Sequence, residues 1–159
     1  MRAYADSSFL VKLLAQEPDS KSAVSEYRRL GCPSLFYLSL HELEVRNAIH
    51  QRAFHQRRAG SSDERKRIFR EKTSAISKLE MLLQRRAFLA VEAEWDAAID
   101  RSRKLSDKYT ENTGARAFDI LHIAFALELE CELFFTSDDR QAKIAKAERL
   151  EVMAVMLES

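Results

Sequence analysis

Residues 2–15 of the chain are RAYADSSFLVKLLA, and this stretch decides the fold class. Residues 2–5 form a short, largely apolar run, which predicts a strand. Asp6 follows, and residues 7–15 then carry apolar side chains at positions 9, 10, 13 and 14, the spacing of one helix face. A strand that leads directly into a helix is the repeating unit of an α/β fold.

The alternation of short apolar runs with longer helical segments continues to the end of the chain. We expect further strands at residues 35–38, 88–91, 133–136 and 152–155. We expect helices at residues 19–30, from 40 past 54, from the Gly60-Ser61-Ser62 break to about 86, and at 94–109, 115–130 and 139–149. Such alternation predicts right-handed crossovers and a parallel sheet with helices on both faces. The prediction is a three-layer α/β fold with an elongated helical hairpin at about 40–86.

Local signals add detail to several helices. Ser39 and Glu42 have the spacing of a capping box at the start of the helix that follows the second strand. Residues 112–114 are expected to form a loop, and the helix at 115–130 is expected to be buried because it is apolar nearly all round. The inward face of the helix at 94–109 is expected to hold Trp95, Ala98, Ile99 and Leu105.

The length and composition favour a single helix-rich domain. A chain of 159 residues predicts one domain, 1–159, and 46% hydrophobic residues suffice for a core. The 3 Gly and 2 Pro argue against an all-β fold and against Gly-rich phosphate loops. The formal net charge of +1 excludes a simple basic nucleic-acid coat, so any electrostatic function depends on how the charges are distributed.

The sequence contains no signal for export or membrane insertion. An acid occurs early in the chain, and no apolar stretch approaches the length of a membrane span. We therefore expect a cytoplasmic protein without a membrane partner. Cys32 and Cys131 do not make a disulfide framework, and we expect both to be small buried side chains.

Four acids from separate segments are expected to meet near one edge of the sheet. Asp6 follows the first strand and Asp138 follows the strand at 133–136, so both lie at the carboxyl edge, where parallel sheets bind ligands. Asp119 lies in the first turns of an apolar helix, and Glu44 lies in the helix after the second strand. Acids held together repel one another, and a divalent cation with oxygen ligands relieves that repulsion. Mg²⁺ or Mn²⁺ in such a site supports phosphodiester hydrolysis.

Each acid also has an ordinary structural explanation. Asp6 and Asp138 each precede a helix and could cap it. Asp119 could pair with Arg116, three residues earlier on the same helix face. Glu44 could equally face solvent. The spacing alone leaves both explanations open for all four acids.

The segment 51–86 is strongly basic. It holds eleven Lys and Arg and four Asp and Glu, an excess of seven positive charges in a chain of net +1. Basic side chains that hold phosphates beside an acidic metal site are what an RNA-cleaving enzyme needs. The alternative is a helical hairpin whose charged face is simply solvated.

Two further side chains near the acids have open roles. Arg116 would either contact a substrate phosphate or orient Asp119. His122, in the buried helix, would be a satisfied core histidine or a general base. None of the four histidines has the spacing of a metal-binding helix.

Four segments resemble the acidic motifs of the PIN domain family, in the family's order. Residues 4–12, YADSSFLVK, resemble the opening strand and first acid, and residues 44–49, EVRNAI, resemble the second motif. Residues 118–124, FDILHIA, resemble the third. Residues 135–138, Phe135-Thr136-Ser137-Asp138, are similar to the fourth motif, a Thr-x-Asp after a strand. By pattern, the chain most resembles the VapC-type toxins of bacterial and archaeal toxin–antitoxin pairs.

This resemblance implies a PIN-like fold and a Mg²⁺- or Mn²⁺-dependent endoribonuclease that acts on RNA. It also implies a homodimer and a small antitoxin protein that blocks the site. The catalytic and metal-binding acids carried over by position are Asp6, Glu44, Asp119 and Asp138, and the motif favours Glu44 over Glu42. The supporting residues are Ser7, Thr136 and Arg116, with Asp139 as an alternative fourth acid.

Two other functions use much the same residues. A Mg²⁺-dependent phosphoryl-transfer domain of the receiver or phosphatase type also places Asp at strand ends, but it gives no role to Asp119 in a buried helix. A non-catalytic RNA-binding or regulatory PIN domain is the second alternative. The presence of all four acids argues against it.

Overall fold

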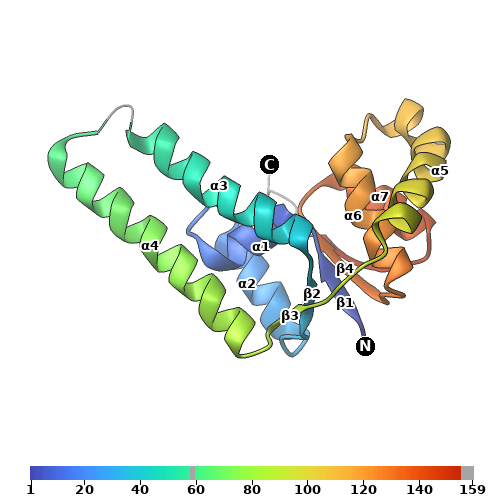
Figure 1. Cartoon of the computed structure of the whole chain (residues 1–159), viewed down its shortest axis with the longest axis horizontal. Coiled ribbons are helices and arrows are strands. Elements are labelled where there is room, and N and C mark those ends of the chain that lie inside the picture. The colour runs from blue at the N-terminus through green and yellow to red at the C-terminus, as the bar shows by residue number, and fades with distance from the viewer. Residues whose placement is uncertain (58–59, 155–159) are drawn as a thin grey trace.

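The computed structural model describes residues 1–57 and 60–154, and in that part of the chain it contains five strands and seven helices (Figure 1). The strands are β1 (Ala3–Ala5), β2 (Leu35–Tyr37), β3 (Phe88–Ala90), β4 (Leu133–Thr136) and β5 (Glu151–Ala154). The helices are α1 (Ser7–Leu14), α2 (Ser20–Arg29), α3 (Ser39–Arg57), α4 (Ser62–Gln84), α5 (Trp95–Thr113), α6 (Ala117–Glu128) and α7 (Asp139–Ala147). Arg58, counted in the basic segment, and Val155, assigned to the last strand, lie outside the described residues.

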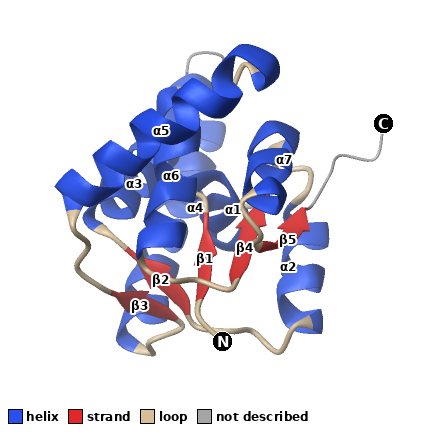
Figure 2. Ribbon diagram, turned by 90° about the vertical axis from the view of Figure 1, so that its right-hand side faces the viewer, coloured by secondary structure: helices blue, strands red, loops and turns tan. Residues whose placement is uncertain are grey.

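All five strands are parallel and form one sheet in the order β3-β2-β1-β4-β5. The sheet lies between helices on its two faces, which confirms the predicted α/β architecture (Figure 2). The chain builds outward from β1 in one direction to β3 and then returns to the other side with β4 and β5. The order therefore reverses between β1 and β4, and a crevice at the carboxyl ends of such strands is where open α/β sheets bind ligands.

Two hydrophobic layers cover the two faces of the sheet. Alternate residues of a strand point to opposite faces, and Ala3, Ala5 and Phe135 accordingly pack with α1, α3 and α4. Tyr4 and Phe134 face the other layer, with α5, α6 and α7. Helix α6 is buried from Asp119 to Ala126, as its apolar sequence predicts. None of the helices in the described residues is both long and apolar enough to cross a membrane.

Helices α3 and α4 form the elongated hairpin predicted at about 40–86, and its distal end projects beyond the sheet (Figure 1). Ser61 caps α4 in a capping box with Glu64, which is why the second helix begins directly after the glycine break. Arg46 of α3 bonds Glu42 and lies 3.8 Å from the Glu80 carboxylate of α4. The Arg46–Glu80 pair therefore links the two helices near the body of the protein.

The capping box predicted for Ser39 and Glu42 is wrong. The Glu42 carboxylate instead accepts a hydrogen bond of 2.9 Å from the Tyr37 hydroxyl and bonds Arg46. The Leu38 N–H is satisfied by His41, whose Nδ1 accepts from it at 2.9 Å. A buried imidazole therefore does the capping that the sequence assigned to a glutamate.

The expected inward face of α5 is only partly correct. Ala98 and Leu105 are buried, whereas Trp95 and Ile99 are 42% and 44% exposed. The Trp95 ring touches the edge of Phe125 at a centroid distance of 4.9 Å, so one side of it packs on α6 and the rest meets solvent. Helix α5 thus covers its neighbour along a narrow stripe and leaves the side chains beside that stripe exposed.

Two smaller expectations are corrected by backbone geometry. Helix α5 continues through Thr113 and ends at Gly114, so the loop predicted at 112–114 is reduced to the left-handed glycine cap, at φ 66°. Cys131 is buried as expected, but Cys32 is exposed. Cys32 lies in the connection after α2 at φ 52°, outside both hydrophobic layers.

Candidate functional site

Asp6 lies where β1 meets β4 and is 2% exposed. Its Oδ1 accepts from the Phe9 N–H at 2.7 Å and from the Ser8 hydroxyl at 2.9 Å, which makes it the N-cap of α1. Its Oδ2 accepts from the Thr136 hydroxyl, at the end of β4, at 2.7 Å. Burial raises the pKa of Asp6, and the donors that lower it do not offset burial. Asp6 therefore caps a helix and also places a buried carboxyl group, whose ionised form is disfavoured by burial, at the switch point of the sheet.

Glu44 reaches the same region from the first turns of α3. Its Oε2 accepts from the Ser7 hydroxyl at 2.7 Å and lies 2.7 Å from His122 Nε2 on α6. Partial burial raises the pKa of Glu44, but hydrogen bonds from His122 and Ser7 outweigh it and leave the pKa below its usual value. The carboxylate is therefore ionised and held between α1, α3 and α6 rather than facing solvent alone.

Asp119 is 6% exposed on the first turn of α6. Its Oδ2 accepts from the Arg116 N–H and from Arg116 Nε, each at 3.0 Å, and its Oδ1 accepts from Gln141 Nε2 at 3.2 Å. The Arg116 side chain is 73% exposed. The pairing anticipated from the i, i+3 spacing is thus present, and the cation that neutralises Asp119 approaches it from solvent.

Asp138 caps α7 directly after β4. Its Oδ1 accepts from the N–H groups of Arg140 and Gln141 at 2.8 and 3.2 Å, and its Oδ2 lies 2.9 Å from Arg140 Nη2. Partial burial raises the pKa of Asp138, but the Arg140 guanidinium and the two backbone donors bring it below its usual value. Asp139 pairs with Lys143 on α7 instead and is half exposed.

The ionised form of Asp138 is expected to stabilise the fold, because its pKa is lower in the folded than in the unfolded state. That stability is present above the unfolded-state pKa of about 3.9 and is lost as the pH falls through the folded-state pKa. Asp138→Asn keeps a good N-cap residue but removes the charge. We expect the variant to be less stable by up to about 1 kcal/mol at pH 7 and to converge with wild type near pH 2. Urea unfolding across this pH range checks it; a constant difference would contradict it.

Three of the four acids are linked by hydrogen bonds, and the four do not share one binding point. Gln141 bonds Asp119 through its side chain and Asp138 through its backbone, and Thr136 joins Asp138 to Asp6. Among residues 1–57 and 60–154, no three His, Cys, Asp or Glu side chains are arranged to hold a metal ion together. Each carboxylate instead accepts hydrogen bonds from protein donors of its own.

The chemistry of the donors nevertheless fits a hard divalent cation. The converging groups are carboxylate and hydroxyl oxygens, the ligands that Mg²⁺ and Mn²⁺ prefer. The charge on Asp119 opposes ionisation of Glu44, and that of Glu44 and Asp6 opposes ionisation of Tyr4, so the acids lie within one another's field. The exposed Arg116 covers Asp119 in this arrangement, and its release would open that carboxylate.

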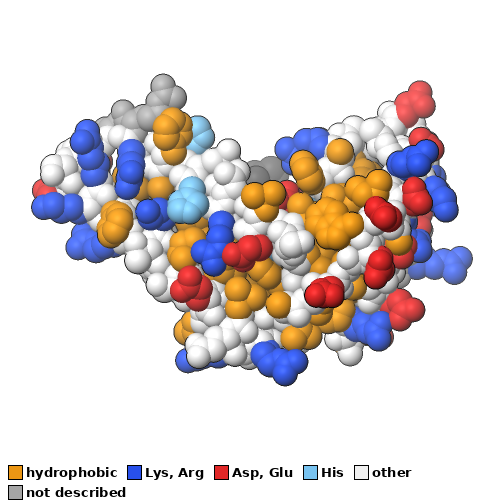
Figure 3. Space-filling model, viewed as in Figure 1, with side chains coloured by type: hydrophobic (Ala, Val, Ile, Leu, Met, Phe, Trp, Pro, Cys, Tyr) orange, Lys and Arg blue, Asp and Glu red, His pale blue; other side chains and the backbone are white. Residues whose placement is uncertain are grey.

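A polar groove lies beside Glu44, between α1 and α3. It encloses about 330 Å³ and is lined by Ser7, Ser8, Asn47 and Gln51 among others. On the face seen in Figure 3, Lys and Arg side chains gather over the distal part of the α3–α4 hairpin. Hydrophobic side chains lie mainly over the middle, and charged side chains of both signs lie toward α5. The candidate site therefore adjoins this groove. The distal hairpin, whose cations include Arg65, Lys66 and Arg70, forms a basic arm farther out.

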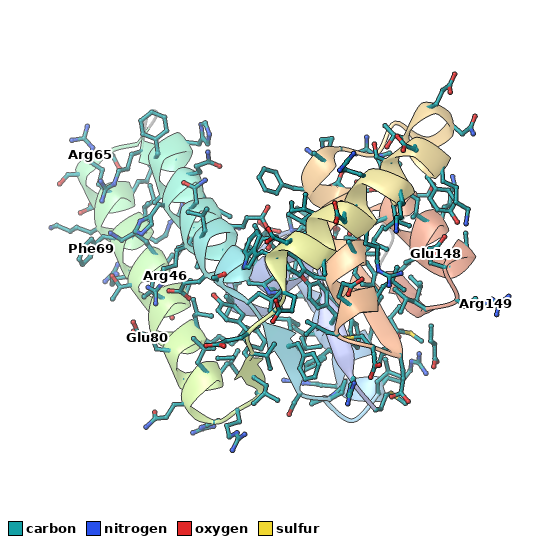
Figure 4. The ribbon with its side chains drawn as sticks, turned by 45° about the vertical axis from the view of Figure 1, so that its right-hand side comes forward. Arg46, Arg65, Phe69, Glu80, Glu148 and Arg149 are labelled. Carbon is teal, nitrogen blue, oxygen red and sulfur yellow. The ribbon has the colours of Figure 1, made fainter. Side chains whose placement is uncertain are left out.

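The basic arm carries cations that are not neutralised by acids. Arg65 and Arg70 have no ion-pair partner among the described residues, and they line a shallow hollow on α4 with Phe69. Phe69 is 54% exposed, and Lys72 Nζ lies 5.0 Å from its ring centroid. Arg65 and Phe69 lie on α4 away from the sheet (Figure 4).

The sequence model of the PIN domain matches residues 3–147. The chain belongs to the PIN domain family. The matched residues include all four acids, Asp6, Glu44, Asp119 and Asp138. No curated protein is similar enough in sequence to count as a relative.

Two solved structures share the PIN fold with this chain. One is VapBC2 from Rickettsia felis bound to a DNA fragment from their promoter, with a TM-score of 0.58, 15% identity, and coverage of 97% of this chain and 98% of the other. The second is FitAcB from Neisseria gonorrhoeae, with a TM-score of 0.56, 13% identity, and coverage of 95% and 96%. At these identities the similarity is one of fold.

The PIN site also contains residues that the sequence did not single out. Gln141, which links two acids, lies three residues after Asp138, a cap position that the motif spacing alone could have suggested. His122 is one that the sequence does single out, as a core histidine or a general base, and in the structure it contacts Glu44. Tyr4 and His41 had no signal in the sequence, because one is a strand residue and the other a helix residue whose partners lie far along the chain.

Proposed function

We propose that this PIN domain is a metal-dependent endoribonuclease that hydrolyses RNA phosphodiester bonds, and that it is the toxin of a type II toxin–antitoxin pair. The observation that carries the proposal is the placement of four acids, one from each family motif, near the switch point of the parallel sheet. Hydrogen bonds through Thr136 and Gln141 join three of them, and Glu44 is held beside them by Ser7 and His122. Buried or partly buried carboxylates whose like charges oppose one another are expected where a cation completes a site.

The acids have distinct tasks in this proposal. Asp6, Glu44, Asp119 and Asp138 would hold Mg²⁺ or Mn²⁺, which when bound supplies an activated water and stabilises phosphoryl charge. The hydroxyl groups of Ser7 and Thr136 donate hydrogen bonds to Glu44 and Asp6 and so fix these two carboxylates in place. Arg116, in reach of both Asp119 and solvent, would exchange its carboxylate for a phosphate of the substrate. We assign the fourth position to Asp138 because Asp139 is engaged by Lys143.

RNA is supported as the substrate by the groove beside Glu44 and by the basic arm farther out on the hairpin. Unpaired cations on the hairpin would attract the phosphate backbone, and exposed Phe69 offers a face on which a base can stack. The groove lined by Ser7, Asn47 and Gln51 supplies hydrogen-bonding groups between that arm and Glu44. A single-stranded segment is favoured, because its bases are free to stack and its backbone can follow a groove.

Partners and setting follow from the same proposal. We propose a homodimer of single-domain chains, 1–159, that acts in the cytoplasm and is inhibited by a small antitoxin protein. One solved structure that is similar to this chain is VapBC2 bound to a DNA fragment from its promoter, which supports an antitoxin partner. The fold similarity covers nearly the whole of this chain and of that one.

Cleavage of end-labelled RNAs by purified, antitoxin-free protein tests the proposed function. We expect discrete cuts in a panel that includes transfer RNA when Mg²⁺ or Mn²⁺ is present. EDTA should remove the cuts, and added metal should restore them, because four acids without a cation repel rather than organise. RNA binding should persist in EDTA, since it depends on the basic arm.

Other outcomes separate the alternative functions. Tight RNA binding without cuts in either metal would favour a non-catalytic RNA-binding PIN domain. A stable aspartyl phosphate after incubation with a phosphoryl donor would favour the receiver or phosphatase reading. Cuts that persist in EDTA would contradict the metal-dependent mechanism.

A further inference from the structure

We infer that His122, held in place by Tyr4, is a positioning residue that fixes the Glu44 carboxylate so that one of its oxygens stays available to a ligand. The inference rests on the proposed function and deepens it, since it assigns the groups that prepare one of the four acids. His122 lies one turn after Asp119 on the buried helix α6 and is 3% exposed.

The Tyr4 hydroxyl sets the orientation of the His122 ring. It lies 2.9 Å from Nδ1, and within the described residues this is its one hydrogen-bond partner. Tyr4 is completely buried, so its O–H needs an acceptor inside the protein. Because Nδ1 is the one partner that the described residues offer this buried hydroxyl, we take the O–H to donate to it. Nδ1 of His122 is therefore the acceptor, and the ring proton lies on Nε2.

The proton on Nε2 points at the Glu44 carboxylate. Nε2 lies 2.7 Å from Oε2 of Glu44, and the Ser7 hydroxyl donates to the same oxygen at 2.7 Å. Ser7 Oγ and Nε2 are 3.3 Å apart, so the three groups form a closed triangle. In residues 1–57 and 60–154, Oε1 of Glu44 takes no hydrogen bond. Two donors thus hold one oxygen, and the second oxygen is left for a cation or its water.

A second histidine braces the backbone around this triangle. His41 is completely buried and stacks on His122 at 5.1 Å between ring centroids. Its Nδ1 accepts from the Leu38 N–H and its Nε2 contacts the Ala5 carbonyl, both at 2.9 Å, so Nε2 must carry the proton. His41 thereby joins the end of β1, just before Asp6, to the start of α3. Both nitrogens of each imidazole therefore have protein hydrogen-bond partners, and neither ring needs a water as a partner.

Matched variants separate positioning from simple core packing. His122→Met removes the donor at nearly constant size, whereas His122→Gln restores an N–H at a similar reach. Tyr4→Phe removes only the hydroxyl. Tyr27→Phe is the control, because its hydroxyl donates to the Pro33 carbonyl away from the acids. We expect His122→Met and Tyr4→Phe to weaken Mn²⁺ binding, measured by titration calorimetry without RNA, by about tenfold or more. His122→Gln should recover most of the affinity, and Tyr27→Phe should leave it unchanged.

Nitrogen-15 spectra of the histidines in full-length wild-type protein give an independent readout. We expect His122, assigned by its absence in His122→Gln, to carry its proton on Nε2 with Nδ1 unprotonated. A ring with its only proton on Nδ1 would overturn the inference. Unchanged Mn²⁺ affinity in a folded His122→Met protein would overturn it as well. If His122→Met does not fold, the tautomer in the wild-type spectrum and the Mn²⁺ affinity of Tyr4→Phe test the inference.

The proposed function can fail separately. Wild-type protein that shows the expected tautomer and the expected loss of Mn²⁺ affinity in the variants, but cuts no RNA, would keep the positioning role and reject the nuclease. Wild-type protein that binds no Mn²⁺ would contradict the proposed function, and the tautomer would then decide the inference by itself.

Discussion

Asp119→Asn is expected to reduce metal-dependent RNA cleavage by on the order of 10²–10⁴-fold, the range seen when a group acting in the transition state is removed. The substitution keeps the shape of a side chain that is 6% exposed, but it replaces a carboxylate oxygen by an amide nitrogen. An amide cannot supply the negative charge that a cation needs. It also releases Arg116, which bonds the native carboxylate at 3.0 Å. Rates on one cleaved RNA, at saturating Mg²⁺, measure the loss.

A second pair on α5 provides the matched control. Asp100 lies 3.4 Å from Arg103 in an ion pair whose two members are three residues apart, as in Arg116 and Asp119, but both side chains are largely exposed. Asp100→Asn should therefore leave cleavage and stability within error, because exposed pairs contribute little. Equal loss in both variants would show that the effect is not specific to the site. Full activity of Asp119→Asn would remove that acid from the proposed set.

The order of strands and helices could be predicted because each element carries its own periodic signal. The strands at 133–136 and 2–5 are short apolar runs, and the helices between them repeat apolar residues every three to four positions. The edge at which Asp6 and Asp138 lie then follows from the rule for parallel sheets, without any knowledge of pairing. The neighbours of β1 did not follow from these signals, since they depend on contacts between residues about 130 positions apart.

The hydrogen-bond partners of the acids were less predictable than the acids themselves. The Ser39–Glu42 pattern is a local signal, but the buried His41 competes for the same helix start and satisfies Leu38 N–H and the Ala5 carbonyl together. A group that meets two buried backbone needs at once stabilises more than a cap at the surface. The outcome of such competition depends on residues that are distant in the sequence, and the spacing of nearby residues does not indicate which they are.

Caps and site residues also proved not to be exclusive alternatives. Asp6 and Asp138 each accept backbone N–H bonds at the start of a helix, as an ordinary cap does. Both also lie at the carboxyl edge of the sheet, after the neighbouring strands β1 and β4, and they are joined through Thr136. The backbone donors and the helix dipole favour a carboxylate at these positions. A strand-to-helix junction is therefore a place where a fold can hold several like charges close together.

Phe135→Ala is expected to destabilise the fold by about 3–5 kcal/mol, the usual cost of removing a buried aromatic ring. Phe135 is completely buried in β4, and its ring contacts Phe9 at 5.0 Å and Tyr27 at 5.9 Å between centroids. Alanine would leave a cavity between the sheet and the helices α1 and α2. For a chain of this size, that loss lowers the melting temperature by on the order of 10 °C, which thermal unfolding followed by circular dichroism measures.

The same substitution connects the core to the site, because the Phe135 carbonyl accepts the Asp6 N–H at 3.0 Å. Phe69→Ala is the matched control, since that ring is 54% exposed on the hairpin and its removal leaves no cavity. We expect Phe69→Ala to keep the wild-type melting temperature, and we expect Phe135→Ala to lose metal affinity as β4 loosens beneath Asp6. A Phe135→Ala protein with unchanged melting temperature would mean that β4 does not pack as described. The arrangement of Asp6, Thr136 and Asp138 would then have no rigid base, because all three depend on the position of that strand.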